Sequence, residues 1–205
     1  MLYRLGIVLI ISYFLGNLNG AILISTLVRK EDIRKKGSGN AGLTNFYRNY
    51  GGVQTLIVLL IDVFKSVVAC LIGQWLLKET AIAPYGRMFA GVAVQLGHVF
   101  PVLYRFHGGK GVLCSAAVVG MVDFRIFLIG ISVFILVLLL TRYVSLGSLC
   151  ALLTCQILLT VLYWKSWGIV LGAWMLGTLA IYMHRSNVAR LLNGTESKFS
   201  LHHKS

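Results

Sequence analysis

Charged side chains are scarce in this sequence of 205 residues. Only 12% of the residues are Asp, Glu, Lys or Arg, whereas 58% are hydrophobic. A water-soluble domain of this length normally carries about 25% charged residues. The longest hydrophilic stretches are about 29–52 and the tail from His184. The composition therefore excludes a soluble domain and predicts a single all-α integral membrane domain over residues 1–205.

Acidic residues are scarcer still, with 6 Asp and Glu against 19 Lys and Arg, so the net charge is +13. Nucleic acid, anionic lipid headgroups and an anionic substrate could each account for such a charge. The basic residues lie between apolar segments, which is typical of the positive-inside topology signal. We therefore expect no nucleic-acid partner, and we assign most of the charge to topology and a few residues to substrate.

Cysteines are few, and none forms a CxxC pair. Cys70, Cys114, Cys150 and Cys155 are the only four, and three of them fall within apolar runs. This pattern argues against a disulfide framework or a zinc site, and we expect neither metal nor cofactor. The first apolar run lacks a small-residue cleavage pattern, so we interpret it as the first span rather than as a signal peptide.

Seven apolar runs are candidate membrane spans, which need roughly 20 residues, although the fourth and fifth runs are short. The stretch 111–141 could be one helix with a re-entrant piece, but Asp123 and Arg125 interrupt it and favour two helices. The predicted spans are about 5–28, 53–77, 87–104, 111–122, 126–141, 144–163 and 168–183.

The distribution of Lys and Arg predicts the orientation of these spans. With the N-terminus outside and the C-terminus inside, the inner loops hold most basic residues, as the positive-inside rule requires. The outer segments then hold only Arg4, Lys78, Arg87, Arg125 and Lys165. The inner loops hold Arg29, Lys30, Arg34, Lys35, Lys36, Arg48, Arg105, Lys110, Arg142, Arg185, Arg190, Lys198 and Lys204.

Four polar clusters interrupt the apolar runs, and all four fall on the inner side in this topology. Hydroxyls, amides, glycines and basic residues at one membrane surface are typical of a site for an anionic, phosphate-bearing substrate. The clusters are 37–48 (GSGNAGLTNFYR), 108–111 (GGKG), 143–148 (YVSLGS) and 184–196 (HRSNVARLLNGTE).

The first cluster combines small residues with hydrogen-bond donors. Its glycines allow backbone N–H groups to turn toward an anion. Arg48 can bind a phosphate through two parallel hydrogen bonds. A flexible loop that merely connects two spans is the alternative. The side chains expected to donate further hydrogen bonds are Ser38, Asn40, Thr44 and Asn45.

The second cluster places Lys110 among Gly108, Gly109 and Gly111, directly before an apolar helix. Helix N-termini bind anions through their free N–H groups and their dipole. The spacing does not match a Walker A loop, and a tight interhelical turn is the alternative. His98, upstream of this cluster, receives a supporting role at most.

The last two clusters offer hydroxyls, an imidazole and an acid. Ser145 and Ser148 share a helix face, and for Ser145 we favour a structural role, in which it bonds its own i−4 carbonyl or packs against a neighbouring helix. His184 and Asn187 are i, i+3 partners, and a histidine can exchange a proton near neutral pH. Glu196 is interpreted either as part of the site or as a surface ion pair.

Asp62 and Lys65 lie three residues apart inside the second predicted span. Charges at such depth are costly and are usually paired. We interpret them as an internal ion pair with a structural role.

In this order and spacing, the clusters resemble the bacterial acyl-phosphate:glycerol-3-phosphate acyltransferase family, PlsY. The matching text is GSGNxGxTN with Arg48, GHxxP followed by GGKG, RYVSL with a second serine, and HRxNxxRLLxGxE. The likeness covers nearly the whole chain. The chain departs from the family pattern at Asn17-Leu18-Asn19, at Ser66 and at Cys114, and the last change puts any hydroxyl role at that position in doubt.

The resemblance implies a seven-span enzyme of the bacterial plasma membrane with its active site on the cytoplasmic face. It implies transfer of an acyl chain from acyl phosphate to the 1-hydroxyl of glycerol 3-phosphate, without acyl-CoA or metal, and it points to no obligatory protein partner. Gly108–Gly111 would receive phosphate. The residues implied to line the active site are Ser38, Arg48, Lys110, Ser148, His184 and Asn187.

The chemistry of these residues fits that role, since acyl phosphate is already activated and mainly needs positioning and charge stabilisation. His184 or a substrate phosphate could accept the proton. A covalent acyl-Ser38 intermediate is possible, but a nucleophilic serine needs a nearby base. The rival function is a transporter of a phosphorylated metabolite, although transporters tend to place polar residues at the bilayer midplane.

Overall fold

The computed structural model describes residues 1–200, and this part of the chain is entirely helical apart from turns and loops. Three short 3₁₀ turns cover Ile33–Lys35, Ala83–Tyr85 and Val102–Tyr104. The α-helices are α1 Leu2–Gly16, α2 Gly20–Leu27, α3 Leu43–Tyr50, α4 Gly52–Leu77, α5 Gly86–Val99, α6 Val112–Val122, α7 Phe124–Thr141, α8 Val144–Leu162, α9 Trp167–Met183 and α10 Arg185–Leu192.

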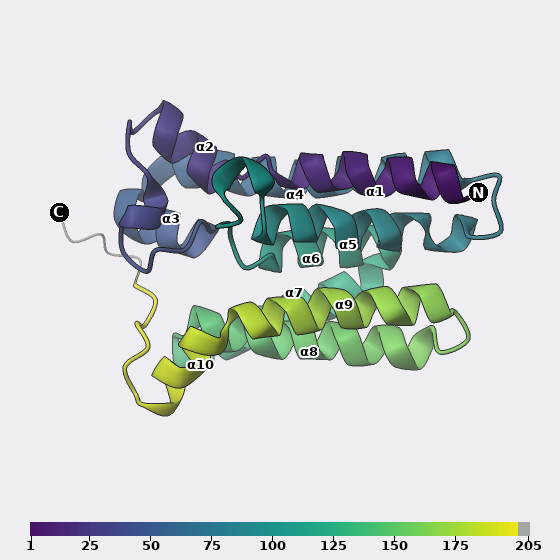
Figure 1. Ribbon diagram of the computed structural model, residues 1–205. Coiled ribbons are helices and arrows are strands. Elements are labelled where there is room, and N and C mark those ends of the chain that lie inside the picture. The colour runs from purple at the N-terminus through teal and green to yellow at the C-terminus, as the bar shows by residue number, and fades with distance from the viewer. Residues whose placement is uncertain (201–205) are drawn as a thin grey trace.

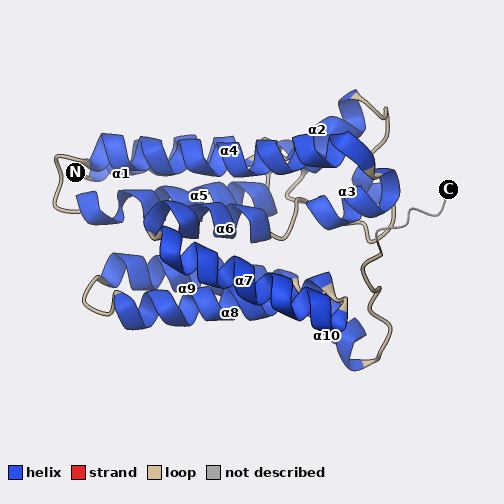
Figure 2. Ribbon diagram, turned by 180° about the vertical axis from the view of Figure 1, so that it is seen from behind, coloured by secondary structure: helices blue, strands red, loops and turns tan. Residues whose placement is uncertain are grey.

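The long helices run side by side in two groups (Figures 1 and 2). α1, α4, α5 and α6 form one half of the bundle, and α7, α8 and α9 form the other. The N-terminus lies at one end, while α2, α3 and α10 gather at the opposite end. An apolar core runs between the helices and includes the almost fully buried Val8, Met88, Val94, Val118, Leu159 and Leu176. The fold thus collects the apolar α2 and the polar α3 and α10 at one end of an apolar bundle.

The seven predicted spans all correspond to helices, but within residues 1–200 only α4, α7 and α8 are long and apolar enough to cross a membrane unaided. The number rises to five if each of the bent pairs α1–α2 and α9–α10 counts as one span. α6 has 11 residues and is therefore about 16 Å long, roughly half of a hydrocarbon core. Seven complete spans and their orientation remain predictions.

The first predicted span, 5–28, consists of two helices. The chain bends by 42° between α1 and α2, at the Asn17-Leu18-Asn19 segment. Asn19 restarts the helix by accepting a hydrogen bond from the Ile22 N–H at 3.0 Å. Hydropathy does not register this break because it lies between two apolar stretches.

The third helix ends earlier than the predicted 104. α5 stops at Val99, and Pro101 begins a 3₁₀ turn. This end of α5 packs directly on α1, because a Cβ on Gly16 would overlap the Val94 carbonyl and a Cβ on Gly97 would overlap the Tyr13 carbonyl. Small residues permit such close backbone packing.

The prediction of two helices within 111–141 is confirmed. α6 and α7 are separate, and the Asp123 carboxylate between them accepts a hydrogen bond from the Arg125 N–H at 2.9 Å, which caps α7. This side-chain cap satisfies an N–H that the new helix start leaves free.

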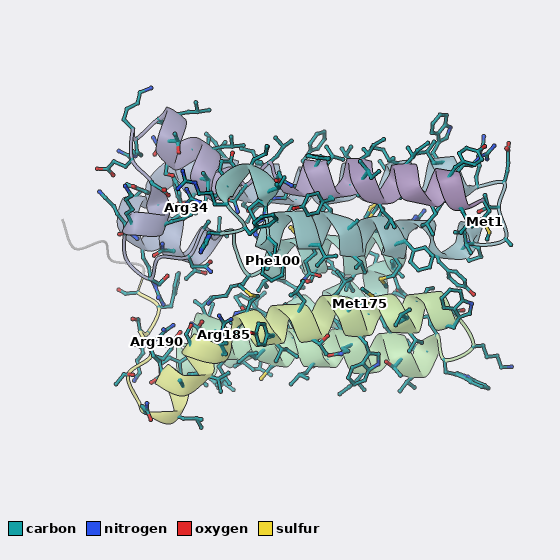
Figure 3. The ribbon with its side chains drawn as sticks, viewed as in Figure 1. Met1, Arg34, Phe100, Met175, Arg185 and Arg190 are labelled. Carbon is teal, nitrogen blue, oxygen red and sulfur yellow. The ribbon has the colours of Figure 1, made fainter. Side chains whose placement is uncertain are left out.

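Two short helices were not predicted. α3 occupies part of what we expected to be a loop, and it buries Phe46 completely against Tyr50. α10 follows α9 after a bend of 54°. Arg34, Arg185 and Arg190 lie toward the end opposite Met1 (Figure 3). Lys204, which was assigned to the inner side, lies outside the described residues.

Candidate active site

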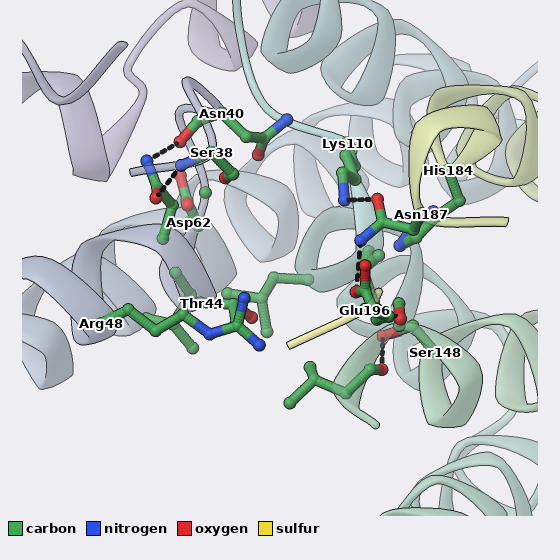
Figure 4. A pocket seen from close by; sticks show the side chains of 18 of the residues that line it. Ser38, Asn40, Thr44, Arg48, Asp62, Lys110, Ser148, His184, Asn187 and Glu196 are labelled. Carbon is green, nitrogen blue, oxygen red and sulfur yellow. Dashed lines mark hydrogen bonds between the residues drawn. The ribbon is translucent and has the colours of Figure 1, made fainter. Parts of the chain in front are cut away.

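A pocket of about 170 Å³ lies between the two halves of the bundle, at the end that carries the short helices (Figure 4). Residues from all four polar clusters line it, although the clusters are far apart in the sequence. Gly108 and Gly109 are not among its walls and lie behind Lys110, against His98. The predicted site residues in its walls are Ser38, Asn40, Thr44, Asn45, Arg48, His98, Lys110, Gly111, Ser148, His184, Asn187 and Glu196.

Asn45 organises the first cluster from its centre. Its amide oxygen accepts a hydrogen bond from the Ser38 N–H at 2.9 Å, and its amide nitrogen donates to the Asn40 and Lys36 carbonyls at 2.9 and 3.1 Å. The side chain is buried. Its hydrogen-bonding capacity is spent on the backbone, so Asn45 shapes the segment instead of offering free donors to a ligand.

The hydroxyls of Ser38 and Thr44 remain available as donors, since neither donates to another group within residues 1–200. Arg48 lies one turn after Thr44 on α3. Its Nη2 donates to the Ser197 carbonyl at 2.9 Å, and the exposed side chain retains further N–H groups. This wall therefore presents two free hydroxyl protons and a guanidinium.

The second cluster forms the turn that begins α6. Gly111 precedes the helix with φ of +82°, a conformation that favours glycine. Lys110 extends across the pocket and donates a hydrogen bond to the Asn187 amide oxygen. Burial lowers the pKa of Lys110 to about 8, and the cations Arg190 and Arg48 act in the same direction, whereas Glu196 opposes them.

Glu196 is buried, with 7% of its surface exposed, so its interpretation as a surface ion pair is wrong. Its Oε1 accepts hydrogen bonds from Ser145 and Asn187, both at 2.7 Å, and its Oε2 pairs with Arg190 at 2.6 Å. Burial raises the pKa of Glu196, but these three donors outweigh it and lower the pKa overall. The carboxylate thus joins α8, α10 and the tail in one wall of the pocket.

Ser148 lines the pocket as expected, whereas Ser145 does not make the helix-backbone bond that we favoured. Ser145 donates to Glu196 instead of to its own i−4 carbonyl, whereas Ser148 donates to the Val144 carbonyl at 2.9 Å, which is the i−4 bond (Figure 4). Since a hydroxyl has a single proton, Ser148 can offer a ligand only its lone pairs.

His184 lies between α9 and α10 and is buried. Its Nδ1 lies 2.7 Å from the Ala180 carbonyl. A carbonyl only accepts, so Nδ1 carries the proton in the neutral ring and Nε2 has a free lone pair. The imidazole can accept a hydrogen bond from a group in the pocket, but burial lowers the pKa of His184 to about 4, so the ring is neutral at pH 7 and only a weak base.

The expected internal ion pair is confirmed, with Lys65 Nζ 2.7 Å from Asp62 Oδ1 and both side chains almost fully buried. Asp62 also reaches the pocket wall, as do Ser145 and Arg190, which the sequence did not single out as site residues. Arg190 follows Asn187 by three residues, and this helical spacing could have identified Arg190 as a site residue. No cluster of three His, Cys, Asp or Glu that could hold a metal occurs within residues 1–200.

The arrangement can therefore bind anions from opposite walls, stabilise developing negative charge with free hydroxyls, and accept a proton.

The sequence of this chain is similar to the sequences of known proteins. Residues 6–194 match the family model for glycerol-3-phosphate acyltransferase. A glycerol-3-phosphate acyltransferase of Thermoanaerobacter pseudethanolicus is 44% identical over 189 residues, 92% of each chain. One from Finegoldia magna is 40% identical over 189 residues, which are 92% of this chain and 93% of the relative.

Two solved structures are also similar. The glycerol 3-phosphate form of PlsY, an integral membrane glycerol 3-phosphate acyltransferase, aligns with a TM-score of 0.87 at 34% identity, over 96% of both chains. Its lysophosphatidic acid form aligns with a TM-score of 0.84 at 33% identity, over 96% of this chain and 95% of that one.

Proposed function

Because this chain belongs to the glycerol-3-phosphate acyltransferase family, we propose that it transfers an acyl chain from acyl phosphate to the 1-hydroxyl of glycerol 3-phosphate. A new ester bond forms, the acyl–phosphate bond breaks, and the products are 1-acyl-glycerol 3-phosphate and inorganic phosphate. The reaction would be the first acylation step of phospholipid synthesis.

One observation carries this proposal: cationic side chains on different helices line a single pocket. Arg48 on α3 and Lys110 before α6 face the same space, and Arg190 on α10 lies beside it. Both proposed substrates bear a phosphate, so two separate cationic groups are needed to hold them together. The glycerol 3-phosphate and lysophosphatidic acid forms of PlsY support the acceptor and the product.

The free groups in the pocket match the remaining chemistry. Acyl phosphate needs no further activation, so alignment and charge stabilisation supply most of the catalysis. Ser38 and Thr44 can donate to the oxyanion that develops on the acyl carbonyl. Ser148, which has only lone pairs to offer, can accept from the glycerol hydroxyl. His184 Nε2 and a phosphate oxygen are the two groups that can take the proton.

The position of the pocket supports a cytoplasmic active site in the bacterial plasma membrane. The pocket lies at the end of the bundle with the short helices, where Arg34, Arg185 and Arg190 are found (Figure 3). By the positive-inside rule this end faces the cytoplasm. Glycerol 3-phosphate would then enter from the aqueous side and the acyl chain from the bilayer.

A comparison of acyl donors tests the proposal. Purified protein is given labelled glycerol 3-phosphate with either acyl phosphate or acyl-CoA of the same chain length, and lysophosphatidic acid is measured. We expect product with acyl phosphate only. Lys110→Ala serves as the negative control, and Lys165→Ala, distant from the pocket, as the matched positive control. Product from acyl-CoA alone would overturn the proposed donor while leaving the acceptor in place.

A further inference from the structure

Lys65 is an amine in the apolar interior, only 2% of its side chain is exposed, and it makes more contacts than an ion pair requires. Besides Asp62 it donates to the carbonyls of Gly16 and Leu18, at 3.2 and 2.9 Å. The break between α1 and α2 frees carbonyls at this point. Lys65 thereby satisfies backbone groups that would otherwise be unpaired in the bundle.

The same amine lies 2.8 Å from Nδ1 of His98, whose side chain is almost fully buried. Asp62 Oδ1 lies 3.6 Å from the same ring nitrogen, so the ammonium, the carboxylate and the imidazole form one buried cluster. The Nε2 edge of the ring lies against Gly109, since a Cβ on that glycine would overlap Nε2 and approach Cε1 to 3.0 Å. The imidazole therefore supports the backbone just before Lys110.

A second path leads from the helix break to the same place. Asn19 caps α2 through its oxygen, and its amide nitrogen donates to the Ala41 carbonyl at 3.0 Å. That carbonyl would lie 2.8 Å from a Cβ on Gly109. Gly109 is thus enclosed by the His98 ring on one side and the Ala41 backbone on the other, where the first polar cluster meets the second.

We propose that Lys65, His98 and Asn19 form a polar scaffold that positions the Gly109 turn, and through it Lys110, against the segment that carries Ser38 and Arg48. His98 is then a positioning residue for phosphate binding, and the inference rests on the proposed function only for the identity of the ligand. An ion pair that merely joined α4 to α1 would not require the imidazole edge to touch the turn.

The contact between His98 and Gly109 can be tested by second-site rescue. Gly109→Ala should weaken glycerol 3-phosphate binding by about tenfold or more, because a small displacement of a binding group has large effects. His98→Asn keeps a polar atom near the Nδ1 position for Lys65 but lacks the ring edge that a Cβ would meet. In that background the cost of Gly109→Ala should be at least about threefold smaller, a coupling of the size expected for residues in contact, and a residual cost should remain because the Cβ would still lie 2.8 Å from the Ala41 carbonyl oxygen.

Gly108→Ala is the matched control, because its Cβ would overlap the His98 carbonyl oxygen, which His98→Asn retains. Its cost should be the same in both backgrounds. Two quantities are measured for each variant: the melting temperature without ligand, and the glycerol 3-phosphate affinity from the ligand-induced shift of that temperature. Neither measurement needs an acyl donor, so the outcome does not depend on whether acyl phosphate is the donor.

We expect rescue in both quantities for Gly109→Ala and in neither for Gly108→Ala. An equal cost of Gly109→Ala in both backgrounds would overturn the contact. Rescue of the melting temperature without rescue of affinity would overturn the positioning role and leave a packing contact. If the wild type did not bind glycerol 3-phosphate, the proposed function would fail, while the melting temperatures would still decide whether His98 supports the turn.

Asn19→Ser tests the other side of the scaffold, since serine can still cap α2 but is too short to reach the Ala41 carbonyl or His98 Nδ1, which lies 3.5 Å from the Asn19 amide nitrogen. We expect it to weaken glycerol 3-phosphate binding several-fold with little change in melting temperature. Unchanged affinity would remove Asn19 from the scaffold.

Discussion

The Lys110 ammonium donates a hydrogen bond to the Asn187 amide oxygen, and Asn187 in turn donates to Glu196. Lys110 belongs to one half of the bundle and Asn187 to the other, so this contact spans the pocket (Figure 4). The lysine is held by a neutral amide instead of by a direct ion pair. Its charge is opposed only indirectly by Glu196, which acts through space and not through a hydrogen bond to Lys110, so the ammonium can still attract a substrate anion.

The first prediction concerns pH. The pKa of Lys110 is lowered to about 8, chiefly by burial, so the charged form prevails below that pH and is lost above it. Glycerol 3-phosphate loses its last phosphate proton at about pH 6 and does not change charge in this range. We expect kcat/KM for glycerol 3-phosphate to fall as the pH rises through about 8. In Lys110→Arg, which stays charged, this fall should be absent; an identical fall would assign it to another group.

The second prediction concerns Arg48. Arg48→Lys keeps the charge but loses the planar set of N–H groups, one of which already donates to Ser197. A lysine cannot bind the tail carbonyl and a phosphate with the same geometry. We expect kcat/KM to fall by about tenfold or more, measured with acyl phosphate as the varied substrate. Arg29→Lys, at an exposed position outside the pocket, should retain wild-type kinetics, and equal kinetics for both variants would reduce Arg48 to a topology signal.

The helices and the convergence of the polar clusters could be anticipated from sequence because both depend on local patterns. Apolar runs predicted every long helix. Counting seven spans from an outer N-terminus placed all four polar clusters on the same side of the membrane. Asp123 marked the division between α6 and α7, because a polar capping residue interrupts the apolar run.

Contacts between distant segments could not be anticipated. Glu196 is 51 residues from Ser145 in the sequence, so its burial depends on how the tail folds back onto α8. The bend at Asn17-Leu18-Asn19 is stabilised by Lys65 from another helix. α3 is short and polar on average, and it is held by Phe46 in a small core that no hydropathy window detects.

The third prediction concerns the stability contributed by Glu196. Glu196→Gln keeps the shape but replaces an oxygen that accepts hydrogen bonds with an NH₂ group that faces other donors, so we expect a loss of about 1–3 kcal/mol. The pKa of this carboxylate is lowered in the folded state. Its contribution is therefore present at neutral pH and is lost as the pH falls through that lowered pKa.

Thermal unfolding of the purified variants measures this loss. Glu79→Gln is the control, because Glu79 forms an exposed pair with Arg4 at the opposite end of the bundle, and its melting temperature should match that of the wild type. A Glu196→Gln protein as stable as the wild type at neutral pH would show that the contacts of Glu196 with Ser145, Asn187 and Arg190 are dispensable for stability.

The fourth prediction concerns orientation. Ser38 is exposed at the end of the bundle that carries the pocket, and Glu79 is exposed at the opposite end. In intact cells, a membrane-impermeant thiol reagent should label Glu79→Cys and leave Ser38→Cys unlabelled until the membrane is opened. The reverse pattern would place the pocket outside the cytoplasm and would contradict the positive-inside assignment.

The last prediction separates direct transfer from a covalent intermediate at Ser38. A serine nucleophile needs a base within hydrogen-bond reach, yet the Ser38 hydroxyl has no such partner within residues 1–200, and Glu196, His184 and Lys110 make their contacts elsewhere in the pocket. Incubation of the enzyme with acyl phosphate alone, followed by mass spectrometry of the intact chain, should therefore reveal no acyl adduct. Ser38→Ala should still lower kcat by about 10²-fold, because it removes a donor to the developing oxyanion. Ser132→Ala, on the exposed face of α7, should be unaffected. A stoichiometric adduct that disappears in Ser38→Ala would replace direct transfer with a two-step mechanism and would require a base to approach Ser38 when acyl phosphate binds.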